Sequence, residues 1–426
     1  MSIKDNFPSV GPSLSLNFAR SKTLDPRITF SRTSVGTHMD GNGLIVTGSA
    51  DEPRFDHKYE NDVVKSLGLL VEESRVTYNT YTEDPTQWNI SNMVATGNSV
   101  TLPTGEVSTT IEYKGETTDA NNKFTRPTVS GSAITAGDTW IYSGFYKKGV
   151  TNGERYVFIT LQNNTASEGT GRRFDFDTGT WQSSQNLNSV TDVDSGYEEY
   201  PNGWYRIWMS CTFPSASGGV QTFTRLNANS TSIPYDTSFS LWGAQLEKAS
   251  FMTSYIPNDT GSTKTRSADS VSMTGTNFSD WYNTTEGTVF LDCTPVYDNS
   301  TNQYRRILSI HNNSGSQTDV IQIIQSEQSN RVSCAVWDGS SFQTGFGEGN
   351  TSGTRFKVAF AVKENNMNAS YDGNIETDDT TCTLPAMTEM DIGSYNNALN
   401  AQTVHINNIS YYPKRLTNTQ LQNLTK

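Results

Sequence analysis

The feature that most constrains the fold of this chain is a succession of short runs of β-branched and aromatic residues. Clusters of Gly, Asn, Asp and Ser separate these runs about every ten positions. Aromatic residues make up 11% of the chain and charged residues 18%, a mix that favours strands over helices. We therefore expect an all-β protein built from tandem antiparallel β-sandwiches (jelly rolls), with an irregular N-terminal segment and one short C-terminal helix.

The clearest runs are 140–146, 155–161, 204–213, 239–246, 288–293, 306–310, 320–324, 331–337, 356–362 and 404–412. Within 204–213, one face carries Tyr205, Ile207, Met209, Cys211 and Phe213, and the other carries Trp204, Arg206, Trp208 and Ser210. Such alternation predicts a half-buried strand in the middle of a sheet. The dipeptides Asp338-Gly339 and Asp372-Gly373 follow strand-like runs and predict tight hairpins.

The length of 426 residues exceeds what one hydrophobic core usually serves. Turn-rich stretches at 72–84 and 258–268 suggest boundaries, so we divide the chain into 1–75, 76–260 and 261–426. At the C-terminus, Thr417 and Gln420 form a capping box, and Leu416 can pack on Leu421. This pattern predicts a helix of about two turns that docks on the preceding sandwich through Leu421 and Leu424.

Charge and cysteine content limit the partners and the compartment. The chain has 31 basic and 44 acidic residues, a formal net charge of −13, and no concentrated basic patch, so we expect no nucleic-acid partner. No apolar run reaches the length of a membrane span, so we expect no membrane insertion. Four widely spaced cysteines predict free, buried thiols and assembly in a reducing cytoplasm: Cys211, Cys293, Cys334 and Cys382.

No motif predicts catalysis, and we expect a protein that is not an enzyme. The histidines His38, His57, His311 and His405 lie in no pattern that ties one to a nucleophile. A glycosidase would need two carboxylates across a cleft, and the candidates are Asp175, Asp177, Asp192, Asp194, Glu198 and Glu199. Asp175 and Asp177 alternate with Phe174 and Phe176, which predicts that both carboxylates lie on the solvent face of an edge strand.

Two kinds of ligand deserve consideration, a calcium ion and a sugar. Loop carboxylates could hold Ca²⁺, with Asp378, Asp379, Asp192 and Asp194 as possible donors, but none has the spacing of a dedicated metal loop. Sugars stack on exposed aromatic rings. Trp140, Trp204, Trp208 and Trp242 fall in strand-like runs and are expected to pack between sheets, whereas the candidates for an exposed platform lie near turns: Trp181, Tyr197, Tyr200 and Trp337.

Several segments form recognisable motifs: PSLSLNFA (12–19), LDPRITFSR (24–32), GLLVEE (68–73), NT (79–80), EDPTQW (83–88), WGAQLE (242–247) and TSYIP (253–257). Together they resemble bacteriophage virion structural proteins of the tail-fibre or appendage type. Those from residue 68 to 257 are similar to the beginning and end of a carbohydrate-binding-module-like jelly roll. EGTVF (286–290) and ISYYPKRLT (409–417) resemble a concanavalin A-like lectin/glucanase sandwich.

This resemblance implies a virion protein that assembles in the host cytoplasm, attaches to other phage virion proteins through residues 1–75, and forms a homotrimer. Its sandwiches would bind glycans of the host surface. The chain lacks the coiled-coil or β-helix segment of many complete fibres, so a second possibility is a capsid or tail decoration or adaptor protein with a purely structural role. An envelope-degrading depolymerase is a third, weaker possibility.

Overall fold

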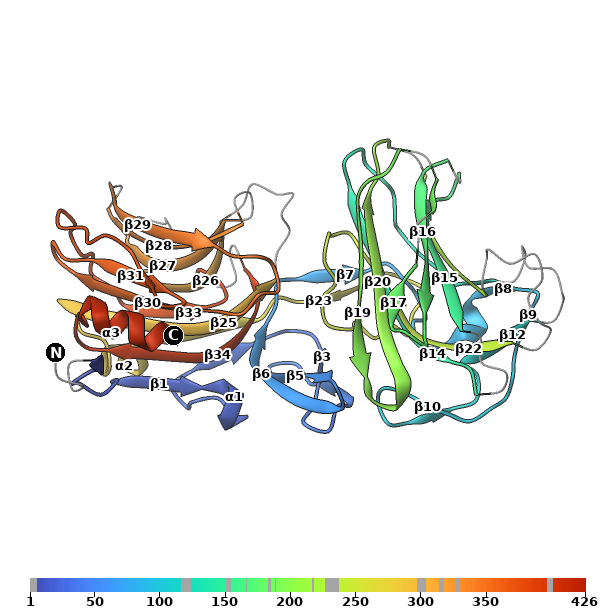
Figure 1. The fold of residues 1–426 in the computed structure, drawn as a ribbon, viewed down its shortest axis with the longest axis horizontal. Helices are drawn as coiled ribbons and strands as arrows, with labels where there is room; N and C mark the ends of the chain where they lie inside the picture. Colours follow the sequence, from blue (N-terminus) through green and yellow to red (C-terminus); the bar gives the residue numbers. More distant parts are fainter. Residues whose placement is uncertain are drawn as a thin grey trace.

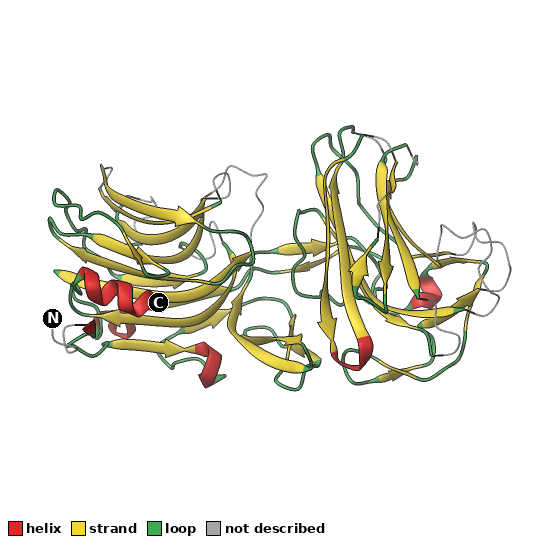
Figure 2. Cartoon of the chain, in the orientation of Figure 1, coloured by secondary structure: helices red, strands yellow, loops and turns green. Residues whose placement is uncertain are grey.

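In a computed structural model, the chain forms two β-rich lobes that lie side by side, with both chain ends in the same lobe (Figure 1). The structure describes residues 6–115, 124–150, 155–165, 167–182, 185–187, 189–216, 218–226, 237–296, 304–313, 318–326, 330–339, 341–396 and 401–426. Strands dominate, and the helices are short (Figure 2). The predicted all-β class with a C-terminal helix is confirmed.

The lobe that holds both chain ends, called the terminal lobe here, is a sandwich of two antiparallel sheets. Its first sheet contains β1 (Leu14–Asn17), β5 (Arg54–Glu60), β6 (Val63–Val71), β25 (Glu286–Val296), β30 (Phe356–Lys363), β31 (Asn368–Tyr371), β32 (Asn374–Ile375) and β34 (Thr403–Tyr412). Its second sheet contains β2 (Thr29–Ser31), β24 (Ser270–Thr274), β33 (Glu389–Ile392), β26 (Tyr304–His311), β27 (Val320–Ser326), β28 (Arg331–Asp338) and β29 (Ser341–Gly349).

The N-terminal segment 1–75 is built into this sandwich. Strand β1 pairs with β34, β2 pairs with β24, and β6 also pairs with β34. Leu14, Leu16 and Phe18 lie in the same hydrophobic core as residues from β25 to β34. The segment therefore forms regular strands where irregular structure was expected, because its alternating apolar residues are buried only when they complete the two sheets.

The other lobe, called the middle lobe, is also a two-layered sandwich. Its first sheet contains β9 (Met93–Ala95), β12 (Glu112–Gly115), β22 (Ser238–Glu247), β14 (Thr139–Lys148), β20 (Trp204–Thr212) and β19 (Thr191–Tyr200). Its second sheet contains β8 (Asn89–Ser91), β13 (Phe124–Arg126), β21 (Val220–Leu226), β15 (Tyr156–Asn163), β16 (Gly169–Asp175), β17 (Thr180–Trp181) and β18 (Gln185–Leu187). Strand β20 lies between β14 and β19, so its predicted central position is confirmed.

Several short elements join the two lobes. A two-stranded ladder of β7 (Arg75–Thr77) and β23 (Lys264–Arg266) carries the chain between them (Figure 1). A hairpin of β3 (Gly36–Met39) and β4 (Ile45–Gly48) packs on the outer face of the middle lobe, in a small core with Phe145 and Trp242. The first sheets of the two lobes meet at one residue pair, Glu199 of β19 with Tyr59 of β5. A further two-stranded ladder is formed by β10 (Val100–Thr101) and β11 (Val107–Ser108).

A buried ion network lies at this joint and consists of Arg32, Arg54, Glu72, Arg266 and Asp269, each at most 1% exposed. Arg54 Nη1 lies 2.5 Å from Glu72 Oε2, and Arg54 Nη2 lies 2.6 Å from Asp269 Oδ2. Glu72 also accepts hydrogen bonds from the backbone N–H and the hydroxyl of Ser254, at the end of the middle lobe. The network therefore connects the N-terminal segment to both crossings between the lobes.

Local sequence signals are reproduced at the turns and helices. Asp372 and Gly373 both have positive φ, 46° and 86°, and connect β31 to β32 as a tight hairpin. Gly339 follows β28 in the same way, with φ of 60°. Helix α3 (Asn418–Thr425) has the predicted capping box; α1 (Phe18–Ser21) and α2 (Thr276–Ser279) are shorter.

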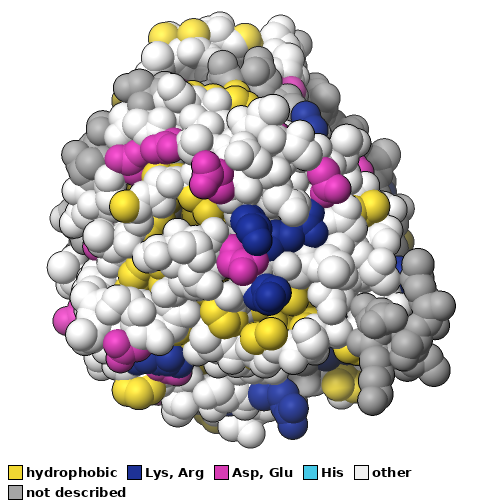
Figure 3. Space-filling view, turned by 90° about the vertical axis from the view of Figure 1, so that its left-hand side faces the viewer, with side chains coloured by type: hydrophobic (Ala, Val, Ile, Leu, Met, Phe, Trp, Pro, Cys, Tyr) yellow, Lys and Arg dark blue, Asp and Glu magenta, His cyan; other side chains and the backbone are white. Residues whose placement is uncertain are grey.

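The predicted docking of α3 is confirmed, since Leu416 and Leu421 are buried against β25 and β30, with Leu424 beside them. All four cysteines are buried and free. Among the described residues, no helix has the length and apolarity needed to cross a bilayer. On the end face of the terminal lobe, basic and acidic side chains are interspersed and hydrophobic side chains form small groups (Figure 3).

Candidate functional site

A groove of about 530 Å³ lies on the outer face of the second sheet of the terminal lobe. It is called the sheet groove here, and its lining residues are Tyr304, Arg306, Gln322, Ile324, Arg331, Ser333, Ala335, Trp337, Phe342, Gly345 and Phe346. These residues come from β26, β27, β28 and β29, which are adjacent strands of one sheet. The groove therefore rests on regular backbone, which holds its side chains in place.

Strand alternation explains which side chains face the groove. In β28, Cys334 and Val336 point into the core, so Ser333, Ala335 and Trp337 point outward. Ala335 lies opposite Gly345 of β29. A Cβ built on Gly345 would lie 2.6 Å from Cζ of Phe342, so the glycine leaves room for that ring. Small residues form the floor of the groove, and aromatic rings rise beside it.

The aromatic wall consists of Trp337 and Phe342, which face each other across β28 and β29. Their ring centroids are 5.3 Å apart in an edge-to-face arrangement, and Phe342 is 56% exposed. Tyr304, 57% exposed, lies at the other end of the lining on β26. Contiguous exposed apolar side chains are a feature of surfaces that bind a ligand or a partner. Trp337, which the sequence predicts as a sugar-binding platform, thus shares the groove with Phe342 and Tyr304, which the sequence analysis did not predict as binding residues.

Two polar side chains reach the groove from positions that are almost fully buried. Gln322 is 4% exposed, and its Oε1 has no hydrogen-bond partner among the described residues. A buried carbonyl oxygen without a donor is costly, so this atom is ready to accept a hydrogen bond from a ligand. Arg306 is also 4% exposed, and its Nη1 donates to the carbonyl of Tyr304 at 3.0 Å. Burial lowers the pKa of Arg306 to about 10, so the guanidinium stays protonated at neutral pH.

The electrostatic character of the sheet groove is positive. Arg306 and Arg331 both line it, and no Asp or Glu is among the described lining residues. Nη2 of Arg331 donates to the carbonyl of Gly347 at 2.6 Å, which fixes the guanidinium at the rim. The arrangement favours a polar ligand with hydroxyl groups and a negative charge, since guanidinium groups pair well with carboxylate and phosphate.

The other predicted platform residues lie in the middle lobe, far along the chain from Trp337. Trp181 is half-buried, lies edge-on to Phe174 at 5.4 Å, and donates its Nε1–H to the carbonyl of Gly196. Tyr197 is 41% exposed and contacts the same Phe174 at 5.6 Å. Tyr200 is only 8% exposed, so it presents no open ring. It packs edge-on to Phe145 because the β3–β4 hairpin covers that face.

Several of the carboxylates proposed as catalytic or calcium-binding groups are hydrogen-bonded to other residues of the protein. Asp175 is 1% exposed and forms a bidentate pair with Arg155, with Nε to Oδ1 at 3.0 Å and Nη2 to Oδ2 at 2.8 Å. The expectation of a solvent-facing position is therefore wrong for Asp175, because β17 and β18 extend the sheet beyond β16; Asp177 is exposed.

Asp378, a suggested calcium donor, accepts hydrogen bonds from Asn368 and Arg415, and Asp379 accepts one from the backbone of Thr381. Asp192 and Asp194 lie on β19, where the ladder to β20 has a register shift. No group of three or more His, Cys, Asp or Glu side chains that could hold a metal ion occurs within the described part of the chain. Calcium binding stays a prediction from the sequence.

No protein-family model and no curated protein matches the chain. Among solved structures, NanB sialidase from Streptococcus pneumoniae shows 13% identity and a TM-score of 0.30, over 35% of this chain and 26% of the sialidase chain. The match thus spans about a quarter of that protein. CBM40 of the Ruminococcus gnavus IT-sialidase, bound to α2,3-sialyllactose, shows 12% identity and a TM-score of 0.30, over 34% of this chain and 84% of that chain.

Domain 4 of AbnA, a GH43 extracellular arabinanase from Geobacillus stearothermophilus, in complex with arabinotriose, shows 12% identity and a TM-score of 0.29, over 37% of this chain and 73% of that chain. The chain thus has distant structural similarity to carbohydrate-binding-module and lectin-like β-sandwich domains over about a third of its length.

Proposed function

We propose that this chain is a glycan-binding structural protein that acts by adhesion and not by catalysis, with the sheet groove as its binding site. The observation that carries this proposal is the buried Oε1 of Gln322, which has no donor among the described residues and belongs to a groove walled by Trp337 and Phe342. Saccharides combine apolar ring faces with many hydroxyl donors. They therefore match an aromatic wall beside an unpartnered acceptor.

The positive charge of the groove favours an acidic saccharide over a neutral one. Arg306 and Arg331 line it without a described acidic neighbour in the lining, so a sugar with a carboxylate or phosphate substituent gains charge-assisted hydrogen bonds there. A single groove of this size gives modest affinity, and a homotrimer would multiply it through effective concentration. This explains how a protein with a net charge of −13 can hold an acidic glycan at one local site.

Calorimetry with acidic and neutral oligosaccharides tests the groove. Trp337→Ala and Gln322→Leu should each raise the Kd for the acidic probe by about tenfold or more, because one removes the stacking face and the other the acceptor. Tyr197→Ala serves as the control, since that ring is exposed but lies in the middle lobe, away from the sheet groove. Wild-type protein that binds no acidic saccharide, or variants that bind as well as wild type, would refute the assignment.

We further propose that the protein is part of a phage virion, as a trimeric fibre or appendage subunit. Support comes from the resemblance of residues 12–32 and 68–88 to such proteins. Because strands of the N-terminal segment are built into the terminal lobe, we place the attachment surface at the end of that lobe, beside both chain ends (Figure 1). Mass spectrometry of purified particles and light scattering of the pure protein test these points. Absence from particles, or a monomer at micromolar concentration, would contradict them.

The decoration or adaptor role is the alternative. The buried ion network supports this role, because ion pairs at the joint stiffen the connection between the lobes, and a structural component of a particle needs such stiffness. In that case, hydrogen exchange of intact particles would show protection over the sheet groove itself, and Trp337→Ala would impair assembly without any effect on binding to cells.

A further inference from the structure

A second and larger cavity separates the two lobes. It has a volume of about 1130 Å³ and is called the interlobe cleft here. One wall is the outer face of β19 and β20, including Glu198, Arg206 and Trp208. The opposite wall includes Asp56 of β5 and His405 of β34, which belong to the terminal lobe. The cleft is therefore formed only when the two lobes are joined.

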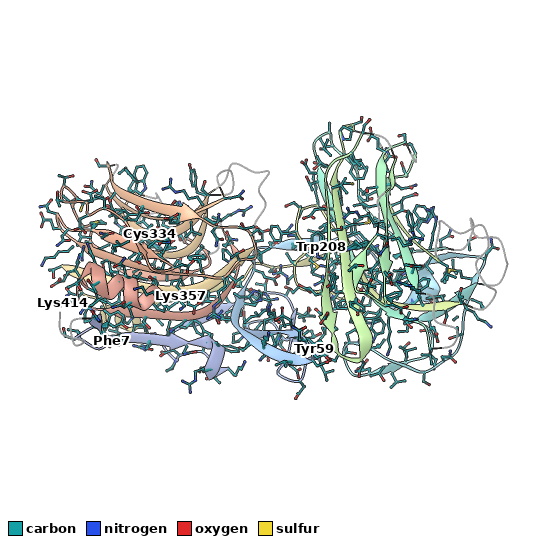
Figure 4. The ribbon with its side chains drawn as sticks, in the orientation of Figure 1. Phe7, Tyr59, Trp208, Cys334, Lys357 and Lys414 are labelled. Carbon is teal, nitrogen blue, oxygen red and sulfur yellow. The ribbon has the colours of Figure 1, made fainter. Side chains whose placement is uncertain are left out.

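Trp208 is the central feature of the first wall. It lies opposite Gly196 in the ladder of β19 and β20. A Cβ built on Gly196 would lie 2.5 Å from Cζ2 and 2.8 Å from Cε2 of the indole, so the ring occupies the space that the glycine leaves open. The carbonyl of Gly196 is also held by Trp181 Nε1–H at 3.2 Å. The side chain is half-buried and lines the cleft, on the side of the middle lobe that faces the terminal lobe (Figure 4).

Trp208 was expected to pack between the sheets, and this expectation is wrong. Its neighbours Ile207 and Met209 fill the core of the middle lobe, so alternation turns the indole outward. No second aromatic ring in the described part of the chain stacks on it. An indole that lines a cleft and carries no other ring supplies an apolar surface on which a pyranose ring can stack.

Pairs of polar residues that face each other across the ladder lie on both sides of this platform. Along the same face of the ladder, Glu198 pairs with Arg206 on one side, and Asp194 pairs with Ser210 on the other. Each pair is two residues from Trp208 along the strand, about 7 Å, which is close to the width of a sugar ring. The exposed Glu198 therefore stands beside the edge of the platform, where it can accept hydrogen bonds from ring hydroxyls.

Arg206 is held in place before any ligand binds. It is 4% exposed, its Nη2 donates to Ser143 Oγ at 3.2 Å and to Thr253 O at 2.9 Å, and its guanidinium lies 5.3 Å from the centre of the Phe145 ring. Its Nε has no hydrogen-bond partner among the described residues, and the residue is part of the cleft wall.

The side chains of the opposite wall are held by hydrogen bonds within the protein. Nε2–H of His405 donates to Asp56 Oδ2 at 2.8 Å, and Asp56 Oδ1 accepts the backbone N–H groups of Met39 and His57 at 2.8 and 2.9 Å. Asp56 is thus saturated by the protein and serves to hold the wall. Glu60, Asp192, Asp194, Glu198 and Glu199 also line the cleft. This acidic lining repels anionic sugars and distinguishes the cleft from the positive sheet groove.

We propose that the interlobe cleft is a second saccharide site, which takes a neutral pyranose on Trp208 and holds its hydroxyls with Glu198 and Arg206. The site is independent of the sheet groove, because the two share no lining residue and differ in the sign of their charge. It gives the protein two saccharide specificities within one chain.

The test uses the full-length protein and neutral hexasaccharides of glucose, mannose and N-acetylglucosamine, with hexagalacturonate as the acidic probe, in calorimetry and tryptophan-fluorescence titrations. Trp208→Ala should raise the Kd of the bound neutral hexasaccharide by tenfold or more and leave hexagalacturonate unaffected. Glu198→Gln keeps the shape and should weaken neutral binding by a smaller factor of about three to ten. Trp337→Ala should show the reverse preference.

Glu198→Gln keeps the proposal testable if Trp208→Ala does not fold, since its side chain is exposed. The proposal is overturned if wild type binds none of the three neutral probes, if Glu198→Gln and Trp208→Ala bind them as wild type does, or if Trp337→Ala abolishes neutral binding. If wild type binds the neutral probes but not hexagalacturonate, the assignment of the sheet groove is refuted and that of the cleft is not. The two assignments can therefore be refuted separately.

Discussion

Glu72→Gln in the buried ion network is the most decisive test of what holds the two lobes together. The carboxylate of Glu72 is 1% exposed and lies 2.5 Å from Arg54 and 3.4 Å from Arg266, with Ser254 donating two hydrogen bonds. Burial alone would raise the pKa of Glu72, but Arg266, Arg54 and the hydrogen bonds from Ser254 outweigh it and hold the pKa well below its ordinary value. Glutamine keeps the shape and removes the charge.

The magnitude follows from the charges that remain. The network holds three guanidinium groups and two carboxylates, so it already has an excess positive charge. Loss of Glu72 leaves buried guanidinium groups without compensation, which costs about 3–5 kcal/mol. This is a large part of the 5–15 kcal/mol that typically separates folded and unfolded states. At about 2–4 °C per kcal/mol, Tm should fall by about 6–20 °C.

The assay is thermal and urea unfolding of wild type and Glu72→Gln from pH 3 to pH 7. A carboxylate whose folded pKa lies below its unfolded value of 4.5 stabilises above that pH, and its contribution is lost as the pH falls further. Wild-type stability should therefore drop below about pH 4.5, and the gap to Glu72→Gln should narrow. Glu60→Gln is the matched control, because Glu60 is exposed and pairs only with surface lysines; little change in Tm is expected.

Equal stability of Glu72→Gln and wild type, or a gap that does not narrow in acid, would refute the reasoning. The double variant Glu72→Gln with Arg266→Met adds a check on coupling. If the two charges act as one unit, removing Arg266 as well should recover part of the lost stability. A double variant as unstable as the sum of the single changes would show instead that the two positions act independently.

Three further outcomes follow from single positions. Thr417→Ala removes the N-cap acceptor of α3 and should cost about 1 kcal/mol, measured as a lower urea midpoint at unchanged m-value; an unchanged midpoint would contradict it. Gly68→Ala would place a Cβ 2.1 Å from a carbonyl oxygen of β34, at a φ of 93°, and should prevent folding. Gly11→Ala is the control and should be neutral, since nothing lies within 4 Å of its Cβ. A folded Gly68→Ala protein would show that the two strands can move apart. Burial raises the pKa of Cys211 and Cys334 to about 12, so thiol reagents at pH 8 should label them only after denaturation, and fast labelling of native protein would argue against their burial.

The sheet groove and the interlobe cleft have a common origin in strand alternation. In β28 and in β20, every second residue fills a core, and the residues between them face outward. At Gly345 and Gly196 the outer face lacks a side chain, and an aromatic ring occupies the space. A glycine on the outer face beside an outward aromatic ring, across the ladder at Gly196 and along the strand at Gly345, is thus a local feature of both sites that becomes visible only once the strand register is known.

Much of the local structure was determined by the sequence alone. The Asp372-Gly373 hairpin, the capping box at Thr417 and the central strand 204–213 depend on interactions within a few residues or on alternation along one strand. The four cysteines are free and buried, as their wide spacing predicted. These features need no knowledge of which strands become neighbours.

Only the tertiary structure decided which distant segments share a core or a site. The pairing of β1 with β34 joins residues almost 400 positions apart and makes the N-terminal segment part of the terminal lobe. Trp337, Phe342, Gln322 and Arg306 become one groove, and Trp208 becomes the wall of a cleft, only through sheet register and lobe contact. The physical reason is that a strand buries one face through pairing with any suitable edge. The sequence of a strand determines which of its faces is apolar, but not which other strand pairs with its edge or packs on that face.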